Sequence, residues 1–177
     1  MTNDVRLIQL PDAAIHALAA GDLAAATRAA GMRLPEYFIS DECRSTWRMR
    51  SAQIAADPNE AAWVTRAIVD FTRGIVVGRA GYHSAPDERG MVELGYAVDP
   101  RQRRRGYARA ALEALLERAE AESAVRVVRA TVRPDNVASR RLIDQYGFVA
   151  VGEQWDDEDG LETVLELGIA PSAANSA

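Results

Sequence analysis

Apolar residues recur along this chain at the two spacings that distinguish helices from strands. The most regular helical series runs from Ala108 to Ala119, where alanine and leucine stand at i, i+3, i+4 and i+7. Shorter segments rich in β-branched residues are separated by turns containing glycine or proline, and this pattern predicts strands. The seven predicted strands are Val5–Leu10, Trp63–Asp70, Gly74–His83, Met91–Asp99, Val125–Val132, Phe148–Gln154 and Glu162–Leu167.

Residues typical of helix starts and helix ends predict the remaining helices. Two short alanine-rich helices are expected to close at Gly21 and Gly31, and a longer one to run over residues 41–56 because Asp57-Pro58 ends it. A last helix is expected to end at Gly147. The acidic or amide residues expected to cap the short helices and the last one are Asp12, Asp22 and either Asp135 or Asn136.

This order of elements predicts an α+β fold. Antiparallel hairpins dominate, and one β-α-β crossover is expected to place two parallel strands at the centre. We therefore expect one mixed, mostly antiparallel sheet of about seven strands with helices on both faces. Residues 1–170 are expected to form one domain, and the small polar tail 171–177 to be disordered.

Composition narrows the classes of function. The net charge of −5 argues against general affinity for nucleic acid or anionic membranes. No apolar run approaches about 20 residues, and the first residues lack a signal region, so we expect a cytoplasmic protein that does not span a membrane. A single cysteine, Cys43, and two histidines, His16 and His83, give no metal-ligand spacing, so no metal is expected.

The stretch from Arg103 to Ala108 carries the most informative chemistry. It reads Arg-Arg-Arg-Gly-Tyr-Ala and lies between a predicted strand and the start of the amphipathic helix. The N-terminus of a helix presents unpaired N–H groups and a positive dipole end, which together suit a pyrophosphate. Side chains at Gly106 and Ala108 larger than these would obstruct the approach of a phosphate to the backbone.

These six residues fit the pattern Arg/Gln-x-x-Gly-x-Gly/Ala, and a second block, Pro134-x-Asn136-x-x-Ser139 with Gly147-Phe148, follows the next predicted strand. In both blocks the chain resembles the GNAT superfamily of acyl-CoA-dependent N-acyltransferases, most closely the branch of ribosomal-protein N-terminal acetyltransferases. The resemblance is specific from about Gly78 to Leu167. It implies an acyltransferase with acetyl-CoA as co-substrate.

The resemblance also implies which residues bind the co-substrate. The turn is expected to hold the pyrophosphate, Ala97 and Val98 to pair with the pantetheine arm, and Asn136 to contact the arm or the phosphates. One N–H of Ala97 or Val98 would face the thioester carbonyl. The expected cofactor-binding residues are Ala97, Val98, Arg103, Arg104, Arg105, Gly106, Tyr107, Ala108, Asn136 and Ser139.

Glu93 is the candidate general base. It interrupts an apolar strand, where a carboxylate seldom lies buried without a partner or a task. Strand alternation puts it on the same face as Gly95 and Ala97. An attacking amine must first lose a proton, which a carboxylate can take directly or through water. The alternatives are a structural pair with an arginine and a solvated face.

The leaving thiolate lacks the family's usual acid. Many members place a tyrosine about seven residues beyond the asparagine, and here that position is Ile143. The related branch has a serine where Ser139 stands, so Ser139 is the candidate acid, with Tyr146 as the alternative. Ala110 is a second departure, since the branch commonly has glutamate there. Ser139 also has a structural alternative, as a first-turn serine that satisfies a backbone N–H.

The acceptor is expected to be a primary amine, either a peptide N-terminus or a small metabolite or antibiotic, bound by a monomer or homodimer. Glu36 and the acidic run 156–159 are candidates for attracting it, although the run also fits a solvated loop. Aromatic candidates for the pocket wall are Tyr37, Trp47, Tyr82, His83 and Trp155. Two other readings are an acyl-CoA-binding regulatory domain without turnover, favoured by Ile143 and Ala110, and a nucleic-acid-binding module.

Overall fold

A computed structural model describes residues 4–157 and 160–170 of the chain. Contacts between residues divide the described chain into two compact units, one of residues 4–85 and 95–115 and the other of residues 86–94 and 116–170. We call them unit 1 and unit 2. One strand and one helix each begin in one unit and end in the other. The predicted tail 171–177 lies outside the described residues.

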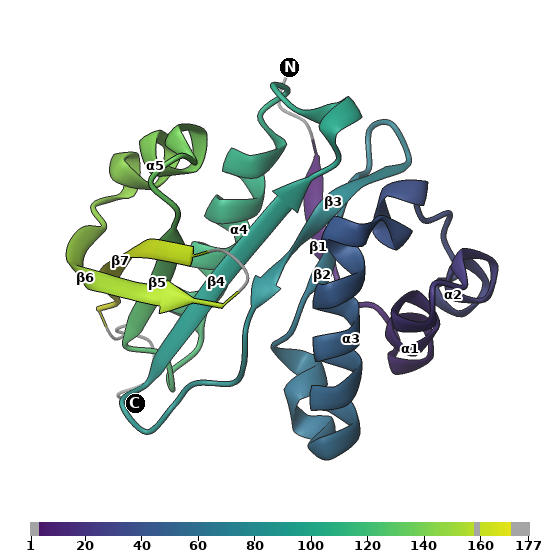
Figure 1. Ribbon diagram of the computed structural model, residues 1–177, viewed down its shortest axis with the longest axis horizontal. Helices are drawn as coiled ribbons and strands as arrows, with labels where there is room; N and C mark the ends of the chain where they lie inside the picture. Colours follow the sequence, from purple (N-terminus) through teal and green to yellow (C-terminus); the bar gives the residue numbers. More distant parts are fainter. Residues whose placement is uncertain (1–3, 158–159, 171–177) are drawn as a thin grey trace, which may run out of the picture. The chain divides into compact units, whose positions relative to one another are not determined.

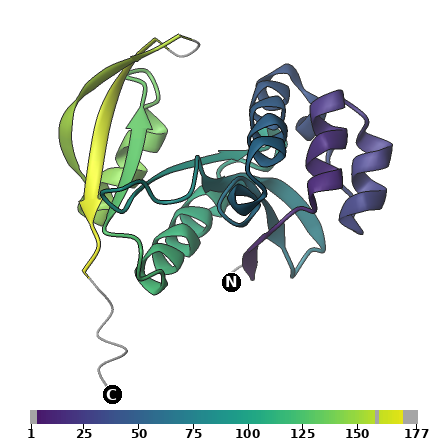
Figure 2. The same cartoon turned by 90° about the horizontal axis from the view of Figure 1, so that it is seen from below.

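Unit 1 contains most of the helices (Figure 1). Its elements in chain order are β1 (Val5–Ile8), α1 (Asp12–Ala20), α2 (Leu23–Ala30), η1 (Glu36–Ile39), α3 (Asp41–Ala56), η2 (Pro58–Ala62), β2 (Arg66–Asp70), β3 (Ile75–Tyr82), the second half of β4 (Met91–Val98), η3 (Pro100–Gln102) and the first part of α4 (Tyr107–Ala121). The η segments are short 3₁₀-helices. Within this unit, α1–α3 lie on one side of β2 and β3 and α4 lies on the other (Figure 2).

Unit 2 is built around antiparallel strands. It contains the first half of β4, the end of α4, β5 (Val127–Val132), α5 (Val137–Ile143), η4 (Asp144–Tyr146), β6 (Val149–Asp156) and β7 (Gly160–Gly168). β7 pairs with β5 on one side and with β6 on the other, antiparallel in both cases. β6 is an edge strand, and Val149, Val151 and Trp155 on it are exposed.

Hydrogen bonds join the strands in the order β1-β2-β3-β4-β5-β7-β6. The two central strands, β4 and β5, are parallel, as the crossover predicts. Their ladder pairs Met91 with Val127 at one end and Leu94 with Ala130 at the other. β4 continues from Gly95 to Val98 beyond this ladder. The predicted fold class, a mixed sheet of seven strands with helices, is confirmed.

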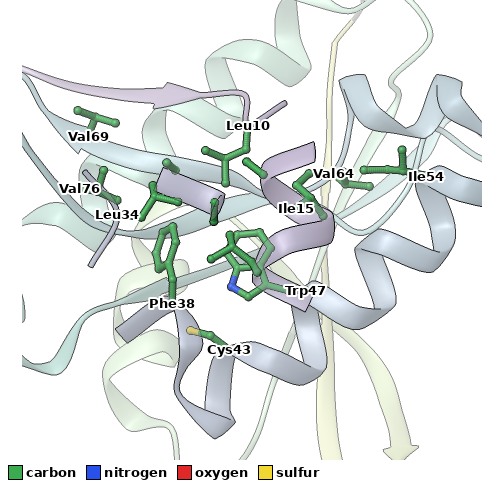
Figure 3. Close-up of a cluster of buried hydrophobic side chains, with 14 residues drawn as sticks. Leu10, Ile15, Leu34, Phe38, Cys43, Trp47, Ile54, Val64, Val69 and Val76 are labelled. Atoms are coloured by element: carbon green, nitrogen blue, oxygen red, sulfur yellow. The ribbon is translucent and has the colours of Figure 1, made fainter. Parts of the chain in front are cut away.

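The core of unit 1 is centred on two aromatic rings. Phe38 and Trp47 are fully buried with ring centroids 5.2 Å apart (Figure 3). Apolar side chains of α1 and α3, such as Ile15 and Ile54, and of β2 and β3 surround them. Cys43 is a free thiol buried in the same cluster. Burial of these side chains fixes α1–α3 against the strands.

The prediction is wrong about the cap of α1 and about the start of the second strand. Asp12 is not the cap of α1, because the helix begins at Asp12 and its N-cap is Pro11, whose carbonyl accepts the Ala14 N–H at 2.8 Å. The second strand begins at Arg66 rather than at Trp63, because η2 follows Asp57 and Trp63 is its C-cap. Asp22 and Asn136 do cap α2 and α5 with their side chains. Over residues 4–157 and 160–170, no helix is long and apolar enough to cross a bilayer.

Candidate functional site

The turn between β4 and α4 is fixed at its start by Asp99. The buried Asp99 carboxylate accepts the Arg101 N–H at 2.9 Å and begins η3. The Asp99 N–H donates to the Val77 carbonyl of β3 at 2.9 Å. The chain therefore leaves β4 in a defined direction and enters the turn at Arg103 after one short helical turn (Figure 1).

The turn then adopts two left-handed backbone conformations. Arg104 has a φ of 61° and Gly106 a φ of 82°. The first bond inside α4 runs from the Ala110 N–H to the Gly106 carbonyl at 3.0 Å. The N–H groups of Gly106, Tyr107 and Ala108 precede this bond and have no acceptor inside the helix. They form the positive end of the helix dipole.

Glycine at position 106 is required by its conformation. A Cβ atom built there meets no protein atom within 4 Å, so the space beside it is open to a ligand. A φ of 82° is nevertheless strained for any residue with a side chain. A side chain at position 106 would therefore obstruct only a bound phosphate. The free chain requires glycine there because of the backbone conformation.

The turn contains three exposed arginines, Arg103, Arg104 and Arg105. The Arg103 Nε donates to the Val98 carbonyl at 3.2 Å, which ties this side chain back to the end of β4. Guanidinium groups bind phosphate oxygens through charge-assisted hydrogen bonds. The open N–H groups and these side chains together form a site suited to an anionic group.

In the second half of β4, the backbone N–H and C=O groups of some residues face β3 and those of others point away from it. A Cβ atom at Gly78 would lie 2.3 Å from the Ala97 carbonyl oxygen, so β3 and β4 approach closely and this carbonyl faces β3. The Asp99 N–H also faces β3. Because successive residues of a strand point their N–H and C=O groups to opposite edges, those of Val98 point away from β3. Of the two predicted N–H groups, the one of Val98 is therefore on the edge that carries Arg103.

A hydrogen-bonded network beside the turn was not predicted from the sequence. The Tyr107 hydroxyl donates to Asp70 Oδ2 at 2.6 Å, and Arg73 Nη1 donates both to this hydroxyl and to Gln102 Oε1 at 3.0 Å. Asp70 Oδ1 accepts the Arg73 N–H at 3.0 Å. Asp70 and Tyr107 are fully buried. No local pattern identifies this network, because Asp70 and Tyr107 are 37 residues apart in the chain.

The network determines the protonation of both buried groups. Burial disfavours the Asp70 carboxylate, but hydrogen bonds from Tyr107 and from the N–H groups of Arg73 and Thr72 outweigh it and lower the pKa of Asp70. Burial raises the pKa of Tyr107, and its hydrogen bond to Asp70 raises that pKa further. At neutral pH the pair is therefore a carboxylate with a neutral phenol.

Glu93 lies in unit 2, half-buried on β4. Its Oε1 accepts the Thr131 hydroxyl hydrogen bond at 2.9 Å. Arg129, its register partner on β5, forms a salt bridge with Glu166 at 2.6 Å. Thr131 was not identified from the sequence. It lies in an alternating strand, and nothing in that pattern marks its contact with Glu93.

The second motif forms the start of α5. The Asn136 side chain accepts the Ser139 N–H at 3.2 Å and so caps the helix. Ser139 is half-buried in the first turn. Ile143 is buried at the end of α5, and Tyr146 is half-buried in η4, one turn further along.

Comparison with known proteins decides the family. Residues 6–149 match the family described as Acetyltransferase (GNAT) domain. The chain belongs to the GNAT acetyltransferase family. Predicted membership of this family is thereby confirmed, and with it the prediction of an acyltransferase domain.

Individual relatives agree with this GNAT assignment. An uncharacterized N-acetyltransferase, YjdG, from Bacillus subtilis (strain 168) is 34% identical over 74 residues, which cover 42% of this chain and 44% of the relative. The match thus spans less than half the length of that curated protein.

Solved structures agree with the GNAT fold without choosing a branch. A ribosomal-protein-S5-alanine acetyltransferase from Vibrio fischeri has a TM-score of 0.62 at 17% identity, covering 93% of this chain and 91% of that chain. A phosphinothricin acetyltransferase from Sinorhizobium meliloti, solved with acetyl-CoA, also has a TM-score of 0.62, at 19% identity, covering 99% and 93%. The ribosomal-protein branch is thus one of several similar groups.

The aromatic candidates for the acceptor wall of this GNAT domain separate into different environments. Trp47 and Tyr82 are wrong as wall residues, because both are fully buried in the core of unit 1. The Tyr37 hydroxyl donates to Glu42 at 2.7 Å, and burial, reinforced by this bond, raises the pKa of Tyr37. Trp155 is 74% exposed on β6.

His83 takes a position that the sequence did not indicate. Its backbone carbonyl accepts hydrogen bonds from Arg50 at 2.8 Å and from Gln53 at 2.9 Å. A Cβ atom at Gly95 would lie 2.9 Å from the His83 Nε2. Glycine at position 95 therefore lets the imidazole lie directly on the second half of β4.

The acidic candidates lie in different units. Glu36 is exposed in η1 of unit 1. In unit 2, Asp156 ends β6 and Asp157 is exposed, while residues 158 and 159 lie outside the described part of the chain. Among the described residues, no group of three or more histidine, cysteine, aspartate or glutamate side chains is arranged to hold a metal ion.

Proposed function

We propose that this GNAT domain is an acetyl-CoA-dependent N-acetyltransferase that transfers the acetyl group directly to a primary amine. The proposal is carried by one observation: the N–H groups of Gly106, Tyr107 and Ala108 have no acceptor inside α4, and the space beside Gly106 is open and next to three exposed arginines. This combination of dipole, backbone donors and guanidinium groups fits a pyrophosphate. Family membership supplies the expectation that the pyrophosphate belongs to CoA.

The second half of β4 is the proposed site of the acyl group. Val98 offers its N–H on the edge away from β3, where it can donate to the thioester carbonyl and stabilise negative charge on its oxygen. Asn136, whose amide oxygen caps α5, retains an NH₂ group that can donate to the pantetheine arm or to phosphate.

Acetyl-CoA supplies an acyl carbon activated as a thioester. In the proposed reaction Glu93 takes a proton from the amine, directly or through water, so that nitrogen attacks as the neutral group. The new C–N bond forms as the C–S bond breaks. Ser139 donates a hydrogen bond to the departing sulfur, which leaves as a thiolate and is then protonated. A free thiol has a pKa near 8.5, so its thiolate is already a tolerable leaving group at neutral pH. The Ser139 hydroxyl therefore assists the departure of the sulfur without being essential.

The acceptor is proposed to be a peptide N-terminus or a small amine. An α-amino group, with a pKa of about 8, is neutralised more easily than lysine at about 10.4. This difference favours a peptide N-terminus. The V. fischeri relative named for a ribosomal protein is consistent with that choice, and the S. meliloti relative named for phosphinothricin is consistent with a small amine.

A thiol-release assay across a panel of amines and peptide N-termini tests the proposal. We expect free CoA to form with one class of acceptor and to fall when Glu93 is replaced by glutamine. An acyl-CoA-binding regulatory domain is the second candidate, favoured by Ile143 in place of the usual tyrosine. CoA binding with no thiol release across the whole panel would support that candidate instead.

A further inference from the structure

One nitrogen of Arg73 joins the two ends of the turn formed by residues 103–106. Arg73 Nη1 donates to Gln102, the residue before the turn, and to the hydroxyl of Tyr107, the residue after it, at 3.0 Å in each case. Asp70 completes the arrangement by accepting hydrogen bonds from the Arg73 backbone and from the Tyr107 hydroxyl, at 3.0 and 2.6 Å. All four residues lie in unit 1.

The turn needs such support. Arg104 has a φ of 61°, which costs free energy for a residue with a side chain, and such conformations persist only where surrounding structure determines them. Within the turn, Arg104 and Gly106 are exposed, and the Arg103 Nε donates to the Val98 carbonyl at 3.2 Å. Further support comes from the hairpin that connects β2 and β3, where Asp70 is buried and Arg73 is exposed.

We propose that Asp70, Arg73 and Tyr107 form a clamp that holds the turn in the left-handed conformation described above and thereby sets the affinity for the pyrophosphate of CoA. The three side chains are positioning residues that act through the N–H groups of the turn. The inference rests on the proposed donor site. A preorganised loop binds more tightly because less ordering is required on binding.

Tyr107→Phe is the direct test, because it removes only the hydroxyl that meets Asp70 and Arg73. Tyr82→Phe is its matched control: Tyr82 is also a fully buried tyrosine, and its hydroxyl donates to the Leu115 carbonyl of α4 at 2.6 Å, away from the turn. Calorimetry with CoA and the full chain is expected to give about tenfold weaker binding for Tyr107→Phe and unchanged binding for Tyr82→Phe. Both variants are expected to lower the unfolding temperature.

Kinetics separate positioning from general destabilisation. In Tyr107→Phe we expect KM for acetyl-CoA to rise while kcat at saturation and KM for the amine stay unchanged. If loss of the buried hydroxyl prevents folding, Arg73→Met provides the second test, because Arg73 is exposed. Its control is Arg28→Met, which removes an equal charge from the exposed face of α2 in the same unit.

The outcomes distinguish this inference from the proposed function. If the wild-type chain itself binds no CoA, the donor site is wrong and the clamp has no ligand. If the wild type binds CoA and Tyr107→Phe or Arg73→Met binds it equally well, the donor site stands and the clamp is refuted. Equal losses in Tyr107→Phe and Tyr82→Phe would likewise refute it, since general destabilisation would explain both.

Discussion

Replacement of Gly106 by valine tests the donor site through the backbone alone. No protein atom lies within 4 Å of a Cβ at this position, so the Cβ of the new side chain has room in the free protein. Its cost comes from the φ of 82°, because a left-handed conformation costs a residue with a side chain about 1–2 kcal/mol. For a chain of this size, that corresponds to a fall in Tm of roughly 2–8 °C.

The effect on CoA binding is expected to be much larger. If residue 106 keeps its φ, the valine side chain projects into the open space where the phosphate would lie. If φ becomes negative, the N–H groups at the start of α4 change direction. Loss of two charge-assisted hydrogen bonds, at about 1.5–3 kcal/mol each, would weaken binding by roughly 10²–10⁴-fold.

Gly31→Val is the matched control. Gly31 has a φ of 65° with no atom within 4 Å of a built Cβ, and it closes α2 away from the turn. Both variants are expected to lose similar stability in thermal unfolding, whereas calorimetry should show weaker CoA binding only for Gly106→Val. Wild-type affinity in Gly106→Val would refute the assignment of the pyrophosphate to this turn.

Three further predictions concern the proposed chemistry and the buried network. Glu93→Gln is expected to lower turnover at neutral pH by roughly 10²–10⁴-fold, with partial recovery at high pH and little change in acetyl-CoA binding; a loss below about threefold across the pH range would leave Glu93 structural. Ser139→Ala is expected to slow turnover only modestly, and a much larger loss in Tyr146→Phe would reverse their roles. The lowered pKa of Asp70 gives stability that is present above the unfolded pKa of about 4 and is lost as pH falls through the folded value. Thermal unfolding of Asp70→Asn is therefore expected to differ from wild type at pH 7 and to approach it in acid, and a constant difference at all pH values would contradict this.

Local signals explain the parts of the fold that the sequence predicted well. α3 runs from Asp41 to Ala56 as predicted, because a residue before proline, here Asp57, disfavours the helical conformation. The strand, turn and helix start over residues 91–121 were equally predictable, since the glycine, the arginines and the helix start are contiguous. The cap of α1 was misplaced by one residue, because the carbonyl of Pro11 accepts the first hydrogen bond before Asp12 can act as a cap.

Contacts between distant segments explain what the sequence could not provide. Asp70 and Tyr107 meet only because β2 and the start of α4 come together in the folded chain. Gly78 and Gly95 looked like ordinary strand residues, although one admits the Ala97 carbonyl and the other the His83 ring. Burial separated the aromatic candidates for the same reason, since neither residue type nor spacing distinguishes the core residue Trp47 from the exposed Trp155.

The different burial of the tryptophans has a spectroscopic consequence. Trp47 is fully buried and Trp63 half-buried in unit 1, whereas Trp155 is 74% exposed in unit 2. An indole in water emits at longer wavelength than one in an apolar core, and an aqueous quencher such as iodide reaches it more readily. Intrinsic fluorescence therefore gives each unit its own reporter, and quenching of the red-shifted component follows the β6 surface without any added dye.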